Sequence, residues 1–198
     1  MYLDHLEQLR VNSTSPLELW AVVRAANLAS NTLRVLEIND YQSSDFARLS
    51  PNISPLHLHP TADLRFGIVL RDDMLPFLDW WINCFKAIEK ESTVMERLTL
   101  RLAGQGPPVT LGQLEPLKRA FEELSGSLSK LFRNVDLVFQ IMNTPCDPNL
   151  DRDSLRGEIV DACKVLKEKA NLRVFDMMPH TADVPGFPFL ASIGRRIL

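Results

Sequence analysis

The sequence predicts an α/β protein: a solenoid of parallel strands that lie side by side in chain order, with helices on the convex face only. Three observations predict this fold class. Six short apolar segments with strand character recur along the 198 residues. Helical segments, or in one interval a polar and proline-rich loop, fit between them. Five of the six strands carry a polar residue between their last two apolar residues, which favours water on one face of the sheet.

The six strands share one pattern, in which an apolar residue is followed by others three and five positions later. The instances are Leu6-Leu9-Val11, Leu33-Leu36-Ile38, Leu64-Gly67-Val69, Met95-Leu98-Leu100, Phe132-Val135-Leu137 and Leu172-Phe175-Met177. Their first residues are separated by 27, 31, 31, 37 and 40 residues. Repeated strand–helix–strand units have right-handed connections and place parallel strands side by side. A doubly wound sheet fits less well, because its strands are buried on both faces and read as nearly continuous apolar runs.

Two helix starts are marked by capping sequences. Ser15 is followed by a proline at the first helical position and by Glu18 three residues later, so the backbone amides at the helix start find acceptors. Thr110 and Gln113 have the same spacing. After Thr110 the apolar residues alternate steps of three and four, at Leu114, Leu117, Phe121, Leu124, Leu128 and Leu131. This segment is predicted to form an amphipathic helix with one buried stripe.

A helix is also expected in the segment that begins DMLPFLDWW. Asp73 is expected to cap it, and Pro76 is tolerated in its first turn. The apolar arc of this helix is wide, as expected for a helix that packs against both a sheet and neighbouring helices. We expect Trp81 to lie in the core and Trp80, at the edge of the arc, to be partly exposed.

The last expected helix starts after Asp151 or Asp153 and buries Leu155, Ile159, Ala162, Cys163, Leu166 and Ala170. Its cysteine and Cys84 lie on apolar helix faces, where they are expected to be inert buried thiols. Cys146 is the cysteine expected to reach solvent. The three cysteines are far apart and contain no CxxC pair, which argues against a disulfide framework or a structural zinc site.

Length and composition predict a single domain over residues 1–198, since 45% of the residues are hydrophobic and can bury one core. The net charge of −3, with the two signs interspersed, argues against nucleic acid as a partner. No apolar run approaches the length of a membrane span, and the first residues lack the apolar stretch of a secretory signal. We therefore expect an intracellular protein, cytoplasmic or nuclear, that does not bind membranes.

Catalytic and metal chemistry find little support. His57 and His59 are two residues apart and His180 is distant, but the two neighbouring prolines indicate loop, so no metal site is predicted. No G-x-S-x-G occurs, and no cysteine has a histidine nearby in the sequence. The glycines of AGQGPPVTLGQ lack the lysine of a phosphate-binding loop. We predict no catalytic residue and no cofactor. The alternative is a small α/β enzyme with a site in the loops at the strand ends.

The L-x-x-L-x-L cores and alternating helices resemble irregular leucine-rich repeats, similar to those of fungal F-box-type leucine-rich-repeat proteins. The resemblance covers about residues 6–178. The asparagine that usually follows the leucine-rich core is replaced by Thr14, Tyr41, Asp72, Ala103, Gln140 and His180. No F-box segment is visible, so binding to a ubiquitin-ligase scaffold is not implied. The resemblance implies a non-enzymatic protein-interaction module, of adaptor or substrate-recognition type.

The partner is expected on the concave face of the sheet, where outward strand positions are unconstrained by helices. The predicted partner-binding residues are Arg10, Glu37, Ile68, Leu70, Thr99, Arg101, Asp136, Val138 and Asp176. Ile68 and Leu70 would form an apolar centre with charged flanks. Residues 179–198 abandon the strand–helix pattern and are expected to fold back over the last strand as a cap, whereas the first strand is expected to have a bare edge.

Overall fold

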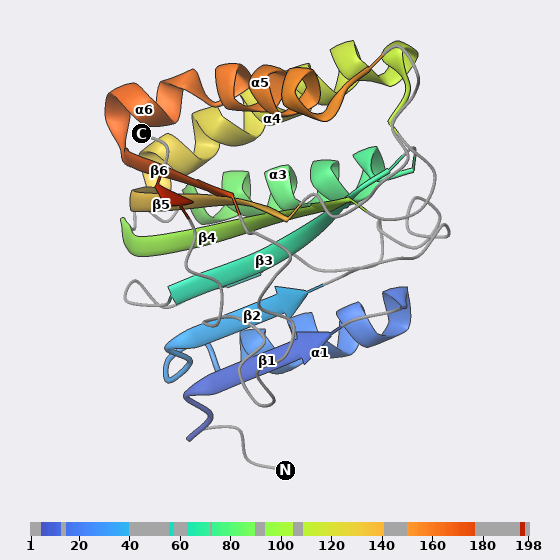
Figure 1. The fold of residues 1–198 in the computed structure, drawn as a ribbon. Helices are drawn as coiled ribbons and strands as arrows, with labels where there is room; N and C mark the ends of the chain where they lie inside the picture. Colours follow the sequence, from blue (N-terminus) through green and yellow to red (C-terminus); the bar gives the residue numbers. More distant parts are fainter. Residues whose placement is uncertain are drawn as a thin grey trace.

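The computed structural model describes residues 5–12, 15–39, 56–57, 63–71, 73–89, 94–104, 109–140, 150–176 and 195–196. Its strands form one sheet in chain order (Figure 1): β1 (Gln8–Asn12), β2 (Val35–Asn39), β3 (Asp63–Leu70), β4 (Met95–Gly104), β5 (Phe132–Gln140), β6 (Asn171–Asp176) and β7 (Arg195–Arg196). The first six strands are parallel, and β7 pairs antiparallel with β6. The predicted order of six parallel strands is confirmed.

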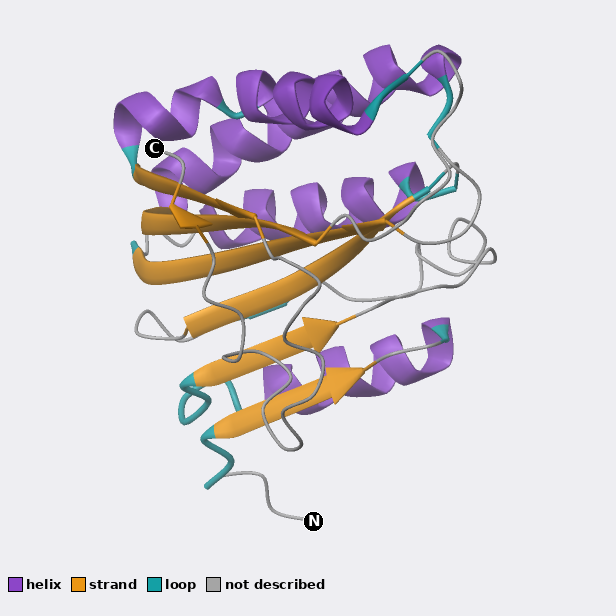
Figure 2. Ribbon diagram, in the orientation of Figure 1, coloured by secondary structure: helices purple, strands orange, loops and turns teal. Residues whose placement is uncertain are grey.

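The helices gather on one side of the sheet, as Figure 2 shows. Helix α1 (Pro16–Leu28) connects β1 to β2, α3 (Leu75–Glu89) connects β3 to β4, and α4 (Leu111–Leu131) connects β4 to β5. Helices α5 (Arg152–Ala162) and α6 (Lys164–Lys169) precede β6. A right-handed connection places its helix on a fixed side of an advancing sheet, and here every strand advances in the same direction. The opposite face, which we call the open face, therefore carries none of these helices.

Strand residues alternate between the helices and the open face. Two rows in register across the sheet point toward the helices: Leu9, Leu36, Leu64, Leu98, Val135 and Leu172, and then Val11, Ile38, Phe66, Leu100, Leu137 and Val174. In β2 to β5 these side chains are at most 1% exposed. They form one hydrophobic core with the apolar stripes of the helices. Burial of these rows fixes the register, because a shift of one residue would turn them all outward.

Two of the six predicted repeat units are wrong in register. Leu64 pairs with Leu36, and Leu172 pairs with Val135, so the third and sixth units lie three residues earlier than the pattern placed them. Because three is an odd number, the predicted faces of these strands are exchanged. In β3 the cause is an almost continuous apolar run, which offers two alternations; packing selects the one that buries Phe66, whose ring stacks on Trp81 at 4.2 Å.

The adjacent tryptophans of α3 are both core residues. Trp81 is fully buried and also stacks on Phe85, with ring centroids 5.6 Å apart. Trp80 is 5% exposed, so the prediction of partial exposure is wrong. Its ring lies 6.0 Å from Phe77 and 4.8 Å from Trp81, because the wide apolar arc brings all these rings into one cluster.

The capping sequences begin helices where predicted. Glu18 donates its backbone N–H to the Ser15 hydroxyl at 3.3 Å, and its carboxylate accepts from the Ser15 amide at 3.2 Å. The Gln113 side chain accepts from the Thr110 amide at 2.9 Å. Asp151 caps α5 by accepting from the Ser154 amide at 2.8 Å.

Two helix predictions need correction. Helix α3 begins at Leu75, and the Met74 carbonyl accepts from the amide of Leu78, so Asp73 is not the cap. The Asp73 carboxylate instead pairs with Arg71. The helix predicted after Asp151 divides at Cys163 into α5 and α6, although the predicted buried stripe is retained apart from a half-buried Ala170.

The two ends of the sheet differ. At the carboxyl end, β7 pairs antiparallel with β6, with Phe175 opposite Arg196. The rest of residues 179–198 lies outside the described residues. At the amino end, β1 pairs with β2 alone among the described strands. Leu6 and Leu9 are half-buried there, and Leu3 lies outside the described residues.

Candidate functional site

The open face presents three rows of mostly polar side chains. The first row holds Gln8, Val35, Asp63, Arg97, Asn134 and Asn171. The second holds Arg10, Glu37, Arg65, Thr99, Asp136 and Arg173. The third includes Arg101, Val138 and Phe175. A polar residue between two apolar ones that face the helices, at the centre of each of β1 to β6, produces the second row.

Six of the nine predicted partner-binding residues lie on this face: Arg10, Glu37, Thr99, Arg101, Asp136 and Val138. The other three do not. Ile68 is fully buried and Leu70 is 3% exposed, both on the helix side, so the predicted apolar centre is wrong. Asp176 also lies on the helix side, in register with Phe139, where the Arg156 guanidinium of α5 donates to it at 3.0 Å. The register error in the third and sixth units accounts for all three.

Three arginines of the open face were missed. Arg65 and Arg173 occupy the second row in place of Ile68 and Asp176, and Arg97 lies in the first row. A signal for the first two exists in the sequence. Arg10, Arg65 and Arg173 each follow a leucine and precede Val or Phe, so an apolar–polar–apolar triplet marks the centre of the strand.

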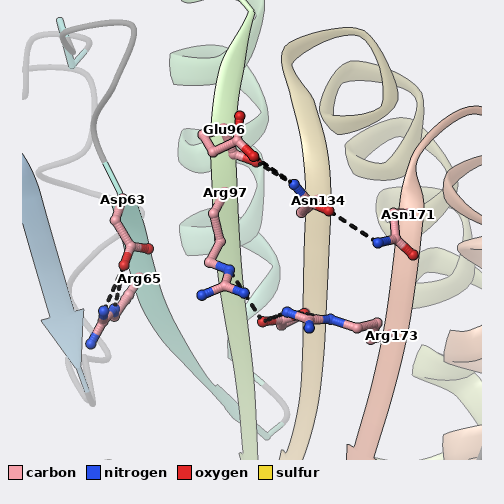
Figure 3. A network of polar contacts seen from close by, with 8 residues as sticks. Asp63, Arg65, Glu96, Arg97, Asn134, Asn171 and Arg173 are labelled. Carbon is pink, nitrogen blue, oxygen red and sulfur yellow. Dashed lines mark hydrogen bonds and ion pairs between the residues drawn. The ribbon is translucent and has the colours of Figure 1, made fainter.

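Asp136 is the centre of one ionic cluster, and Figure 3 labels its two arginines, Arg97 and Arg173. Two nitrogens of the Arg173 guanidinium donate to its two carboxylate oxygens, each at 2.6 Å. Such bidentate pairs are the strongest and most geometrically defined hydrogen bonds between charged side chains. Arg97 approaches the same carboxylate from the other side, with Nε 3.7 Å from Oδ2. Strands β4, β5 and β6 are thus joined through one buried carboxylate.

Glu37 is the centre of a second cluster. Its Oε2 lies 3.8 Å from Arg10 Nε and 3.9 Å from Arg65 Nη1, while its Oε1 accepts from the side-chain Nδ2 of Asn39 at 2.7 Å. Arg65 also donates to Asp63 at 2.6 Å. This hydrogen bond, together with the charges of Asp63 and Glu37, raises the pKa of Arg65 against the opposing effect of burial. Glu37 Oε2 and Asn39 Oδ1 are buried, and neither accepts a hydrogen bond from the described part of the chain.

An amide row lies beside these clusters. Asn134 donates to the Glu96 side chain at 3.0 Å and to the Glu96 carbonyl at 3.1 Å, and Asn171 donates to Asn134 at 3.0 Å (Figure 3). Since these residues come from β4, β5 and β6, the row repeats the cross-strand connection made by Asp136. The polar groups of the open face are therefore held in fixed positions on a rigid sheet.

Two carboxylates of the open face, Glu37 and Asp136, lie deeper than the neighbouring Arg10 and Arg97. The side chains of Glu37 and Asp136 are 6% and 12% exposed, whereas those of Arg10 and Arg97 are 56% and 47% exposed. Arg65 and Arg173, at 22% and 25%, are about as exposed as Asp63 at 24%. The surface is suited to hydrogen bonding with an oxygen-rich partner, because a guanidinium offers several donors and no acceptor.

The residues considered for catalysis or metal binding do not meet in the described part of the chain. Burial raises the pKa of both Cys84 and Cys163 to about 12, so neither thiol is activated. His57 is exposed and donates its backbone N–H to Asn27 at 2.8 Å, whereas His59, His180 and Cys146 lie outside the described residues. Within the described ranges, no group of three His, Cys, Asp or Glu could hold a metal ion.

The chain matches no family model, no curated protein and no solved structure. Among the described helices, none combines the length and the apolar character that crossing a membrane requires. The function of the chain is therefore inferred from the geometry of the open face.

Proposed function

We propose that this chain is a non-enzymatic protein-interaction module, of adaptor or substrate-recognition type, that binds a protein partner on the open face. We further propose that the sheet and helices form a leucine-rich-repeat-like solenoid with a concave open face, similar to those of fungal F-box-type leucine-rich-repeat proteins. The observation that carries the proposal is the sheet face itself: six parallel strands in chain order, with helices on one side and ordered charged side chains on the other.

The register of the strands supports the solenoid. The equivalent positions are Leu9, Leu36, Leu64, Leu98, Val135 and Leu172, which give spacings of 27, 28, 34, 37 and 37 residues. These spacings are more regular than those of the sequence pattern alone. Each unit adds one strand and contacts chiefly its neighbours, as in solenoid proteins.

The strand order also argues against the enzyme alternative. Open α/β sheets bind their ligands at a point where the strand order reverses, because neighbouring loops diverge there and leave a crevice. The order of β1 to β6 contains no such reversal. A site of that type therefore has no place along the described strands.

Cross-linking tests the proposal. A photoreactive amino acid is placed at Thr99 or at Val138, both on the open face, and at Glu122 of α4, an exposed position in the helix layer. We expect the two open-face positions to yield the same discrete protein adduct and Glu122 to yield none. If the interaction is specific, adding an excess of the unmodified protein should lower the yield of this adduct.

Adducts confined to Glu122, or different unrelated adducts at Thr99 and Val138, would show that the open face is not the binding surface. Thermal unfolding of each modified protein checks that the fold is retained before the adducts are compared.

A further inference from the structure

We infer that two copies of this chain associate through the outer edge of β1, with the two β1 strands antiparallel and a two-fold axis at Leu9. This surface is separate from the open face, so the inference goes beyond the proposed function. Three features carry it: a core that is less covered at β1 than at the other strands, an outer strand edge that can accept another strand, and side chains that suit pairing with an identical strand.

The hydrophobic core is less covered at β1 than in the rest of the sheet. Leu9 and Val11 are half-buried, whereas the residues in register with them on β2 to β5 are at most 1% exposed. Leu6, just before β1, is also half-buried and packs against the same core. At the opposite end, Val174 of β6 is 1% exposed, and β6 is paired on both sides. Apolar surface at the β1 end is therefore available for burial on association.

The outer edge of β1 can pair with another strand. The Glu7 carbonyl accepts from the Val35 amide of β2. Because main-chain groups alternate sides along a strand, those of Gln8, Arg10 and Asn12 point away from β2. Among the described strands, none pairs with β1 on that side. The strand also contains no proline, lysine or bulge, the features that commonly protect an exposed edge from pairing.

The side chains of β1 suit antiparallel pairing with a second β1 centred on Leu9. This register places Leu9 opposite Leu9 of the second copy and Arg10 opposite Gln8, and it keeps the apolar residues of both strands on the helix side. Within one chain the Arg10 guanidinium donates to Gln8 Oε1 at 3.5 Å, so the same two groups can also hydrogen bond across the strands. Centring the pair on Arg10 would instead bring two cations face to face, which is unfavourable.

A second copy covers this end of the molecule better than an isolated peptide strand. The end has two layers, β1 in the sheet and α1 on its helix side (Figure 1). A single added strand would extend the sheet and leave the helix layer as it is. A two-fold axis perpendicular to the sheet adds β1 and α1 of the second copy together, with both helices on the same face. The interface is then isologous and closes as a dimer.

The oligomeric state of the full chain tests the inference. Sedimentation equilibrium over a concentration series should show a monomer–dimer equilibrium for the wild-type protein. Gln8→Pro removes an outward-pointing N–H and no bond to β2, so we expect the dimer dissociation constant to rise by at least about tenfold. Gln8→Thr changes the same side chain but keeps the N–H, and it should dimerise as the wild type does.

A disulfide tests the register independently of the proline variant. In a pair centred on Leu9, the two Leu9 Cα atoms form a non-hydrogen-bonded pair about 4.5 Å apart, a distance that a disulfide spans. Leu9→Cys should therefore give a covalent dimer under mild oxidation. Leu28→Cys, at a position 65% exposed on α1, is the matched control and should give no more covalent dimer than the wild type.

A wild-type protein that stays monomeric throughout the series, or equal dimerisation of folded Gln8→Pro and Gln8→Thr, would overturn the inference. If Gln8→Pro does not fold, the absence of a covalent Leu9→Cys dimer decides against it. A dimer that is lost in Leu28→Arg but retained in Gln8→Pro would also overturn it, because the exposed face of α1 would then be the interface.

Discussion

Asp136 shows how a single carboxylate can organise three strands. Its side chain is 12% exposed and accepts from two nitrogens of Arg173, while Arg97 lies on its other side. A carboxylate in this position loses its hydration on folding, and its hydrogen bonds with Arg173 offset that loss. Removing its charge leaves two arginines facing each other across β5.

We therefore expect Asp136→Asn to lower the free energy of unfolding by about 1 to 3 kcal/mol. Urea denaturation measures the change. The matched control is Glu115→Gln, which removes the partner of Arg119 in an exposed pair on α4 and should change stability by less than about 0.5 kcal/mol. Equal effects of the two substitutions would show that the Asp136 cluster adds nothing beyond a surface ion pair.

The buried thiols make a second prediction at the scale of single residues. Burial raises the pKa of Cys84 and Cys163 from 9.0 to about 12. Above about pH 9 the unfolded chain loses these protons while the folded chain retains them, so rising pH favours unfolding. Stability from these groups is complete below about pH 9 and is lost between about pH 9 and 12.

Denaturant unfolding across that range should therefore show a steeper loss of stability for the wild-type protein than for a Cys84→Ala/Cys163→Ala double variant. Parallel pH profiles would contradict the buried, protonated state of the two thiols. Reaction with a thiol reagent at neutral pH provides a second readout, since Cys84 and Cys163 should react only after unfolding.

Among the elements, the helices are held to the sheet by their apolar stripes more than by charges. Ion pairs do join neighbouring helices, as between Lys130 of α4 and Glu89 of α3 at 2.5 Å and between Lys118 of α4 and Glu158 of α5 at 2.8 Å. Their side chains are about one-third to two-thirds exposed, and pairs of this kind contribute little to stability. The buried apolar faces of α3 and α4 hold these helices against the sheet instead.

Leu124→Ala and Trp81→Ala test this packing. Both side chains are fully buried in the shared core, and we expect each substitution to lower the free energy of unfolding by about 2 to 5 kcal/mol through lost burial and a residual cavity. Leu17→Ala on α1, at a side chain 73% exposed, is the control and should have a small effect. Chemical denaturation that found either core variant within about 0.5 kcal/mol of the wild type would refute the assignment.

The start of α1 gives a milder prediction. Ser15→Ala removes the hydroxyl that accepts from the Glu18 amide, and we expect a loss of about 1 kcal/mol in the free energy of unfolding. Ser15→Asp keeps an acceptor at the cap and should restore most of this loss. Thermal or denaturant unfolding of the two variants would contradict the capping role if both were equally destabilised.

Local sequence signals predicted the elements better than they predicted the faces of the strands. Capping residues identified the starts of α1, α4 and α5 because the necessary contacts lie within three residues. The face of β3 was predicted wrongly because residues 66–70 are all apolar or glycine and fit either alternation, while the packing of Phe66 against Trp81 of α3 fixes the choice. Arg65 and Arg173 were missed because the repeat pattern was placed three residues too late in β3 and β6, although an apolar–polar–apolar triplet surrounds each arginine. Arg10, Glu37, Thr99 and Asp136 lie in strands where the pattern had the correct register.

On the scale of the whole molecule, the fold separates two surfaces of different character. The helix layer carries pairs of exposed opposite charges, whereas the three rows of the open face hold five arginines, Arg10, Arg65, Arg97, Arg101 and Arg173, against the carboxylates Glu37, Asp63 and Asp136. The chain as a whole is acidic, with a net charge of −3.

The central claim is that the open face binds a protein partner, and the dissociation constant of the cross-linked partner tests it most directly. The measurement compares the wild-type protein with Thr99→Trp, which places a bulky ring at the middle of the open face, and with Glu122→Trp on the exposed side of α4. We expect Thr99→Trp to weaken binding by about a hundredfold or more and Glu122→Trp to leave it within about twofold of the wild type. Unchanged affinity in Thr99→Trp, with the fold retained, would contradict the account.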